Sequence, residues 1–158
     1  MPIKYLSSTD EDLFSYVNLV LPAWILLILL PRWKVTPLVV NATVGGFCIM
    51  YALLMATQLT GEAQTLSFQD MLSYEGVAKL FTTRAMVLPC WVHFAAFDLF
   101  TARWIALDSI KKNVPTLLVA PVQLLTMFMG PVGLLAYAVL RTVASRKPAA
   151  KGSKSKAA

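Results

Sequence analysis

Residues 91–108, WVHFAAFDLFTARWIALD, are apolar enough to lie in a lipid bilayer, yet they carry four ionisable side chains. These side chains are His93, Asp98, Arg103 and Asp108. The stretch is close to the roughly 20 residues that an α-helix needs to cross about 30 Å of hydrocarbon. Ionisable groups are rare inside membranes, and where they occur they often mark a functional site. We therefore expect a membrane helix that carries a polar site.

The composition of the whole chain agrees with a membrane protein. Of its 158 residues, 58% are hydrophobic and 14% are charged, and the mean hydropathy is +0.66. This balance is more apolar than that of soluble globular domains. The net charge is +6, but the basic residues lie near the ends of apolar segments and in the last part of the chain. We therefore expect contacts with lipid headgroups and no nucleic-acid partner.

Sequence patterns typical of metal and cofactor sites are not found in the chain. There is a single histidine, which argues against a multi-histidine metal site or a haem site. Cys48 and Cys90 fall in apolar stretches, form no CxxC motif and are typical of small buried side chains. A phosphate-binding glycine loop and a serine-nucleophile motif are also missing. We expect no metal and no cofactor.

Four apolar segments are each long enough to cross a bilayer. They cover about 13–30, 37–57, 85–107 and 116–139. Pro22 interrupts the first segment, and the run Gly130-Pro131 interrupts the fourth. Such breaks either bend a helix so that it lines a cavity or only help it to pack. The predicted fold is all-α, an integral membrane four-helix bundle, in which residues 1–140 form a single four-span domain.

The polar segments outside these spans predict the remaining structure. Residues 61–84 form either a short interfacial amphipathic helix, broken at Gly76, or a surface loop with helical turns. Residues 141–158 form a basic tail that we expect to be disordered and to contact headgroups. The acidic run 10–12 differs from signal and transit peptides, so we expect the chain to begin at or near its functional domain.

The distribution of Lys and Arg predicts the orientation of a four-span protein. Nine of these residues lie in the N-terminal segment, the loop between the second and third spans, and the tail, whereas four lie in the other two loops. Because positive charge is enriched on the cytoplasmic side, both termini are expected on that side, or on the stromal side of a plastid membrane.

Asp98 is the most deeply placed charged group, about twelve residues from either end of its predicted span. A charge at the bilayer centre costs at least about 2.5–3.5 kcal/mol on insertion scales. Either a partner offsets this cost or the carboxyl group stays protonated, because a low dielectric disfavours its charged form. At 100° per residue, His93 and Asp98 point about 140° apart, so we expect no direct pair along the helix.

Structural roles for these residues are the alternative interpretation. Buried Asp and His side chains also fix how membrane helices pack, and Arg103 is also suited to anchor its helix at the interface. The aromatic residues of this span also serve packing and the interfacial belt. The candidate partners of Asp98 are Arg103 of the same span and three residues of other segments, which are Asn18, Asn41 and Gln123.

Three motifs resemble one family of membrane proteins. They are GVAKLF (76–81), WVHFAAFDLFTARW (91–104) and GPVGLLAY (130–137). The chain resembles the neoxanthin synthase-like family, four-helix membrane proteins that include the plant protein linked to abscisic-acid deficiency. The similarity runs from about Met71 to Leu140 and is less specific in the first two spans. The resemblance implies a multi-pass protein of a plastid membrane, thylakoid or envelope, or of a bacterial inner membrane.

The resemblance also implies an activity, because the plant members are associated with converting violaxanthin into neoxanthin. This isomerisation opens an epoxide and creates an allene. The implied function is a cofactor-free intramolecular isomerase of epoxy-carotenoids, in which Asp98 donates a proton to oxygen and His93 removes one from carbon. Further residues are expected to hold the long apolar polyene, and these are Trp91, Phe97, Phe100, Arg103, Trp104, Gly130 and Pro131.

A non-catalytic function is the alternative. The chain is short, has almost no soluble domain and carries a basic tail, which is also typical of a transmembrane subunit of a photosynthetic or respiratory complex. Such a subunit would bind pigment or lipid. The expected partners are therefore membrane lipids and a carotenoid or other long apolar ligand, together with a larger membrane complex in the alternative case.

Overall fold

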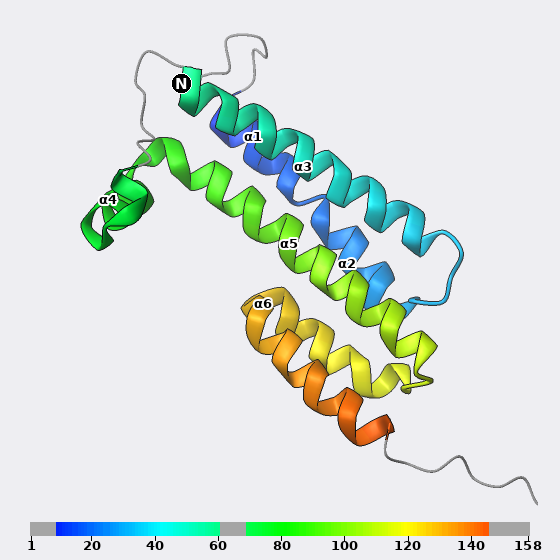
Figure 1. Ribbon diagram of the computed structural model, residues 1–158. Coiled ribbons are helices and arrows are strands. Elements are labelled where there is room, and N and C mark those ends of the chain that lie inside the picture. The colour runs from blue at the N-terminus through cyan, green and yellow to red at the C-terminus, as the bar shows by residue number, and fades with distance from the viewer. Residues whose placement is uncertain (1–8, 61–68, 146–158) are drawn as a thin grey trace, which may run out of the picture.

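The computed structural model describes residues 9–60 and 69–145, and their regular secondary structure is helical throughout. Figure 1 shows the arrangement of these helices, which are α1 (Asp10–Val17), α2 (Val20–Leu29), α3 (Thr36–Thr60), η1 (Asp70–Leu72), α4 (Tyr74–Thr82), α5 (Arg84–Lys111) and α6 (Thr116–Ser145). By length and composition, four helical segments can cross a membrane: Asp10–Leu29, Thr36–Leu59, Arg84–Lys111 and Thr116–Ala144. The predicted all-α membrane fold is confirmed.

α5 is the central helix of the molecule. It contacts α1, α2, α3, α4 and α6. Ala96, Ala102 and Ala106 are buried along it, and their small side chains let the neighbouring helices approach closely. Two apolar clusters surround α5, one shared with α1 and α3 and the other with α2 and α3. Asp98 lies midway along this enclosed helix.

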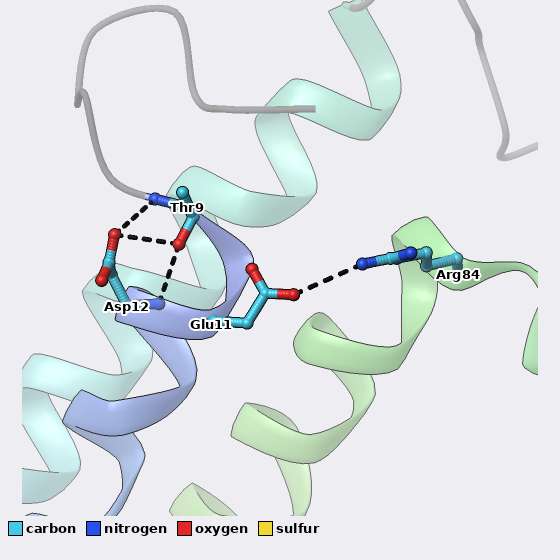
Figure 2. A network of polar contacts seen from close by, with 4 residues as sticks. All are labelled: Thr9, Glu11, Asp12 and Arg84. Carbon is cyan, nitrogen blue, oxygen red and sulfur yellow. Dashed lines mark hydrogen bonds and ion pairs between the residues drawn. The ribbon is translucent and has the colours of Figure 1, made fainter.

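The start of α1 is fixed by a capping box (Figure 2). The backbone N–H of Asp12 donates to Thr9 Oγ1 at 3.2 Å, and the backbone N–H of Thr9 donates to Asp12 Oδ2 at 2.9 Å. Glu11 Oε1 also lies 3.4 Å from Nη2 of Arg84, at the start of α5. Both side chains of this ion pair are exposed, so it adds little stability. It does show that α1 and α5 begin at the same end of the molecule.

The predicted first span is two helices rather than one. α1 ends at Val17 and α2 begins at Val20, so Asn18 and Leu19 lie at the break. Pro22 explains it, because proline has no N–H to donate to the carbonyl of Asn18 four residues earlier. That carbonyl instead accepts from Leu21 N–H at 3.0 Å.

A short helix, α4, lies between α3 and α5. This agrees with one of the two structures that we expected for residues 61–84. Ser73 caps α4 by accepting from the N–H of Gly76 at 3.1 Å. Gly76 lies inside α4 instead of breaking it, and it packs so closely on the Asp70 backbone that no Cβ would fit. Residues 61–68 of this segment lie outside the described residues.

α6 reverses its direction in the middle. Met129 has a non-helical backbone (φ −144°, ψ 48°), and Figure 1 shows the arm before it (116–128) beside the arm after it (130–145). Gly133 of the second arm packs on the Thr126 backbone of the first, with no space for a Cβ. Val119 and Val122 of the first arm share a buried cluster with Tyr137 of the second. α6 is therefore a helical hairpin.

The reversal determines where the start of α1 and the end of α6 lie relative to each other. Four complete crossings would place the start of α1 and the end of α6 on the same side. The second arm instead returns to the end of α5, where Arg141 Nε lies 2.9 Å from Asp108 Oδ2. The start of α1 and the end of α6 thus lie at opposite ends of the molecule (Figure 1). The apolar length of a segment predicts that it can lie in a membrane, but it contains no information on where the helix reverses.

The helical part of α6 also extends past residue 140, where the predicted four-span domain ends, and continues to Ser145. The rest of the predicted tail, residues 146–158, lies outside the described residues.

Candidate functional site

A groove of about 660 Å³ lies where α5 meets the α1–α2 break and the bend of α6. Its volume is in the range of sites that hold small organic ligands. Most of its lining is apolar and aromatic, including Trp91 and Phe94 of α5 and Phe128 of α6. Apart from the tryptophan indoles, two of the lining side chains are polar, and these are Asn18 and Asp98.

Asp98 is the ionisable residue of this groove. Its side chain is half-buried, and no described residue donates a hydrogen bond to its carboxyl group. Four partners were expected from the sequence, and among the described residues none of them forms a hydrogen bond or ion pair with it. They are Asn18, Asn41, Arg103 and Gln123. Gln123 instead donates from Nε2 to the carbonyl of Ala102 at 2.9 Å. The carboxyl group is thus available to a ligand in the groove.

The bend of α6 forms one wall of the groove. Met129, Gly130 and Pro131 all line it, and Gly130 packs against the Asp98 carboxyl group. A Cβ on Gly130 would overlap Oδ1 of Asp98, so this position requires glycine for the observed contact. Pro131 has no N–H, which ends the hydrogen-bond ladder of the first arm. The glycine and the proline thus bring the tip of the hairpin to the acidic group.

His93 lies on a different face of α5. Its ring stacks on Phe97 with a centroid distance of 4.6 Å, and it lies 5.4 Å from the ring of Tyr51 in α3. It does not line the groove. His93 is within electrostatic range of Asp98, but no hydrogen bond joins the two side chains. The expected acid and base are therefore not brought together as a pair around one ligand.

The other residues expected at the site divide into two groups. Trp91, Gly130 and Pro131 line the groove. The remaining four lie outside its lining, and they are Phe97, Phe100, Arg103 and Trp104.

Each residue of the second group has a different environment. Phe97 covers the His93 ring, and about half of Phe100 is exposed on the outer surface. Trp104 packs edge-on against Tyr137, with ring centroids 5.7 Å apart. Arg103 has a buried Nε without a hydrogen-bond partner among the described residues.

A polar cluster that the sequence did not predict closes the other end of the hairpin. Asp108 accepts a hydrogen bond from the hydroxyl of Tyr137 at 2.7 Å and pairs with Arg141 at 2.9 Å. Sequence reasoning placed Asp108 and Arg141 on opposite sides of the membrane. The signal that could have found the cluster is the pair of glycines around Pro131, which permits a reversal as well as a kink.

The chemistry available in the groove is that of a single carboxyl group in apolar surroundings. When neutral, such a group donates through its O–H and accepts through its carbonyl oxygen. Hydrogen bonds to it are stronger than in water because little solvent competes. Over residues 9–60 and 69–145, no three His, Cys, Asp or Glu side chains are grouped as metal ligands are.

Comparisons with known proteins agree with the resemblance inferred from the three motifs. A family model described as ABA DEFICIENT 4-like matches residues 12–137. The chain is also 25% identical over 129 residues to Protein ABA DEFICIENT 4, chloroplastic, from Arabidopsis thaliana. That alignment covers 78% of this chain and 57% of the plant protein, so the chain spans less than two thirds of its relative. No solved structure matches the chain.

The family match includes every residue that lines the groove, from Val17 at the end of α1 to Val132 in the bend of α6. It also covers most of the described helices. The chain belongs to the ABA DEFICIENT 4-like family.

Proposed function

We propose that the chain is a carotenoid-acting membrane protein that isomerises an epoxy-xanthophyll in the groove, a conversion of the violaxanthin-to-neoxanthin type. The observation that carries the proposal is the Asp98 carboxyl group, which lies in an apolar groove midway along a membrane-type helix. Burying an ionisable group there is costly, and no described residue offsets the cost with a hydrogen bond. Membership of the family supports the substrate class.

The lining of the groove suits a long conjugated ligand. Trp91, Phe94 and Phe128 offer flat aromatic surfaces, and each is more than half exposed. The groove is therefore open to the lipid in which such a ligand dissolves. Asn18 supplies a carboxamide that can bond a hydroxyl group on the end ring of the ligand. A ligand oriented in this way presents its epoxide to Asp98.

One carboxyl group is sufficient for the reaction. Neutral Asp98 gives its proton to the epoxide oxygen as the C–O bond breaks. The other carboxyl oxygen then takes a proton from the neighbouring chain carbon, and the electrons of that C–H bond form the new C=C bond of the allene. The substrate keeps its composition and Asp98 ends neutral, so no cofactor is consumed. We assign both transfers to Asp98 because His93 does not line the groove.

Removing the acid tests this assignment. Membranes that contain the Asp98→Asn variant and are supplied with violaxanthin should form neoxanthin at least about 100-fold more slowly, the usual loss for a general acid–base group. Phe100→Leu is the matched control, since Phe100 lies on the same helix but outside the groove. His93→Ala should keep most of the activity. An Asp98→Asn variant with unchanged product formation would refute the proposal.

Binding without turnover is the second candidate function, favoured because the groove contains one ionisable side chain and is open to lipid. In that case wild-type membranes would retain violaxanthin during purification in mild detergent but form no neoxanthin. Native electrophoresis adds a further distinction. An enzyme should migrate as a small species, whereas a subunit should migrate with its complex.

A further inference from the structure

The hairpin of α6 is too short to cross a membrane twice. At 1.5 Å per residue its arms are about 20–24 Å long, whereas the hydrocarbon core is about 30 Å thick. Its tip lies at Gly130, beside Asp98 in the middle of α5. Its open end lies at the end of α5, where Tyr137 and Arg141 contact Asp108. These contacts place the hairpin along one half of α5 only.

A hairpin of this kind is compatible with a bilayer. Both arms are helical, so the backbone groups in the interior of each arm are satisfied by its own hydrogen bonds. The reversal lies against α5 rather than alone in lipid, because Gly130 packs on Asp98. Gln123 of the first arm donates to the α5 backbone and is buried, as is Tyr137 of the second. The Nε2 group of Gln123 and the hydroxyl of Tyr137 therefore bond to protein.

The hairpin gathers basic residues at one end of the molecule. We define the basic end by residues 30–35 and 111–115 and by the end of α6. Its described Lys and Arg residues are Arg32, Lys34, Lys111, Lys112 and Arg141. The sequence continues from Ser145 into residues 146–158, which contain five further Lys and Arg residues and no acidic residue.

The opposite end of the molecule is acidic. We define the acidic end by the start of α1, the end of α3, η1, α4 and the start of α5. Its described basic residues are Lys79 and Arg84. Its described acidic residues are Asp10, Glu11, Asp12, Asp70 and Glu75. The difference in Lys and Arg between the two ends is the feature that sets membrane orientation.

The groove lies at the middle of the molecule and reaches into its acidic half. Its lining includes Val17 and Asn18 at the end of α1 and Trp91 in the first half of α5. Its base is the hairpin tip beside Asp98. α6 covers one face of α5, but only from the basic end to the middle of the helix. The hairpin therefore leaves the other half of this face uncovered.

We propose that residues 10–145 cross the membrane three times, that α6 is a re-entrant hairpin entering from the cytoplasmic or stromal side, and that the groove admits its apolar ligand from the opposite leaflet. The last part rests on the proposed function. The first two parts rest on the helical contacts and the charge distribution. This orientation, with the start of α1 on the far side, replaces the one expected from four complete crossings.

Cysteine labelling in a bacterial inner membrane tests the proposal. Native Cys48 and Cys90 are first replaced by alanine, and single cysteines are then introduced as Tyr74→Cys at the acidic end, Lys112→Cys at the basic end and Thr142→Cys in the second arm. All three positions are exposed. A membrane-impermeant maleimide added to intact spheroplasts should label the Tyr74→Cys variant. It should label the other two variants only after the membrane is opened.

Other labelling patterns would overturn the proposal. If the Thr142→Cys and Tyr74→Cys variants react from the same side and Lys112→Cys from the other, α6 crosses the membrane and is not re-entrant. If Lys112→Cys and Thr142→Cys react in intact spheroplasts and Tyr74→Cys does not, the orientation and the leaflet are wrong. The readout does not require turnover. A failure of the proposed isomerase activity therefore leaves this test unaffected.

Discussion

Gly130 packs directly against the carboxyl group of Asp98. A Cβ atom at position 130 would overlap Oδ1 and Cγ of that group. The contact joins the bend of α6 to the middle of α5 and sets where the acid lies in the groove. Since the overlapping atoms belong to the end of a side chain, a larger residue at 130 can move the carboxyl group without moving either helix.

Gly130→Ala should therefore separate activity from stability. We expect the free energy of unfolding to change by less than about 1 kcal/mol, because Asp98 can rotate away from the new methyl group. Isomerase activity should fall at least about tenfold, because a displaced acid no longer meets the epoxide in a reactive geometry. Thermal unfolding in detergent and product formation in membranes measure the two quantities. Full activity in this variant would show that the contact does not position the acid.

Gly133→Ala should have the opposite effect. A Cβ at Gly133 would overlap the backbone N and Cα of Thr126, which cannot move without separating the two arms of the hairpin. We expect a loss of about 1–3 kcal/mol in unfolding free energy, the usual cost of overpacking. Gly45→Ala is the matched control, because a Cβ there meets no atom within 4 Å. Thermal unfolding of both variants checks the prediction, and equal stability would contradict it.

The Asp108–Arg141 pair should stabilise the closed end of the hairpin. About 15% of the Asp108 side chain and 40% of the Arg141 side chain are exposed, so the pair is between a surface and a buried ion pair. A double-mutant cycle with Asp108→Asn and Arg141→Gln should give a coupling energy of about 1–3 kcal/mol. Chemical unfolding in detergent micelles measures it. Additive effects of the two substitutions would mean that the pair adds no net stability.

Gln123 offers a test of how a buried polar group is tolerated. Its Nε2 donates to the Ala102 carbonyl, whereas its buried Oε1 has no partner among the described residues. Gln123→Leu should change the unfolding free energy by no more than about 1 kcal/mol, because one hydrogen bond and one unsatisfied acceptor are lost together. Gln123→Glu keeps the size of the side chain and should cost more than about 2 kcal/mol, because it buries an ionisable group. Thermal unfolding ranks the two variants, and a more stable Gln123→Glu would contradict the reasoning.

Local sequence patterns were sufficient to predict the second and third spans. The apolar segments 37–57 and 85–107 correspond to α3 and α5, which begin one residue earlier and end three or four residues later. The direction of α6 could not be predicted in the same way. Gly130, Pro131 and Gly133 permit either a kink or a reversal, and the choice depends on contacts with α5 that are distant in sequence. Apolar periodicity contains no information on such contacts.

The sequence predicted only part of the candidate site, again because it does not show which distant segments come into contact. An ionisable residue in an apolar helix indicated Asp98, and breaks in the fourth span indicated Gly130 and Pro131; all three line the groove. The aromatic residues of α5 lie on several faces of the helix, and the sequence could not show which face remains uncovered. The hairpin decides this, because it leaves Trp91 beside the groove and packs Tyr137 on Trp104.

The reversal of α6 also gives the molecule an unequal cross-section. Among the described helices that are long enough to span a membrane, α2, α3, α5 and both arms of α6 occupy the basic half, whereas the acidic half contains α1, α3 and α5. The short η1 and α4 lie at the acidic end. A protein of this wedge shape displaces more lipid from one leaflet than from the other. It therefore fits best in a bilayer that is convex toward its wider side, which links the architecture to membrane curvature.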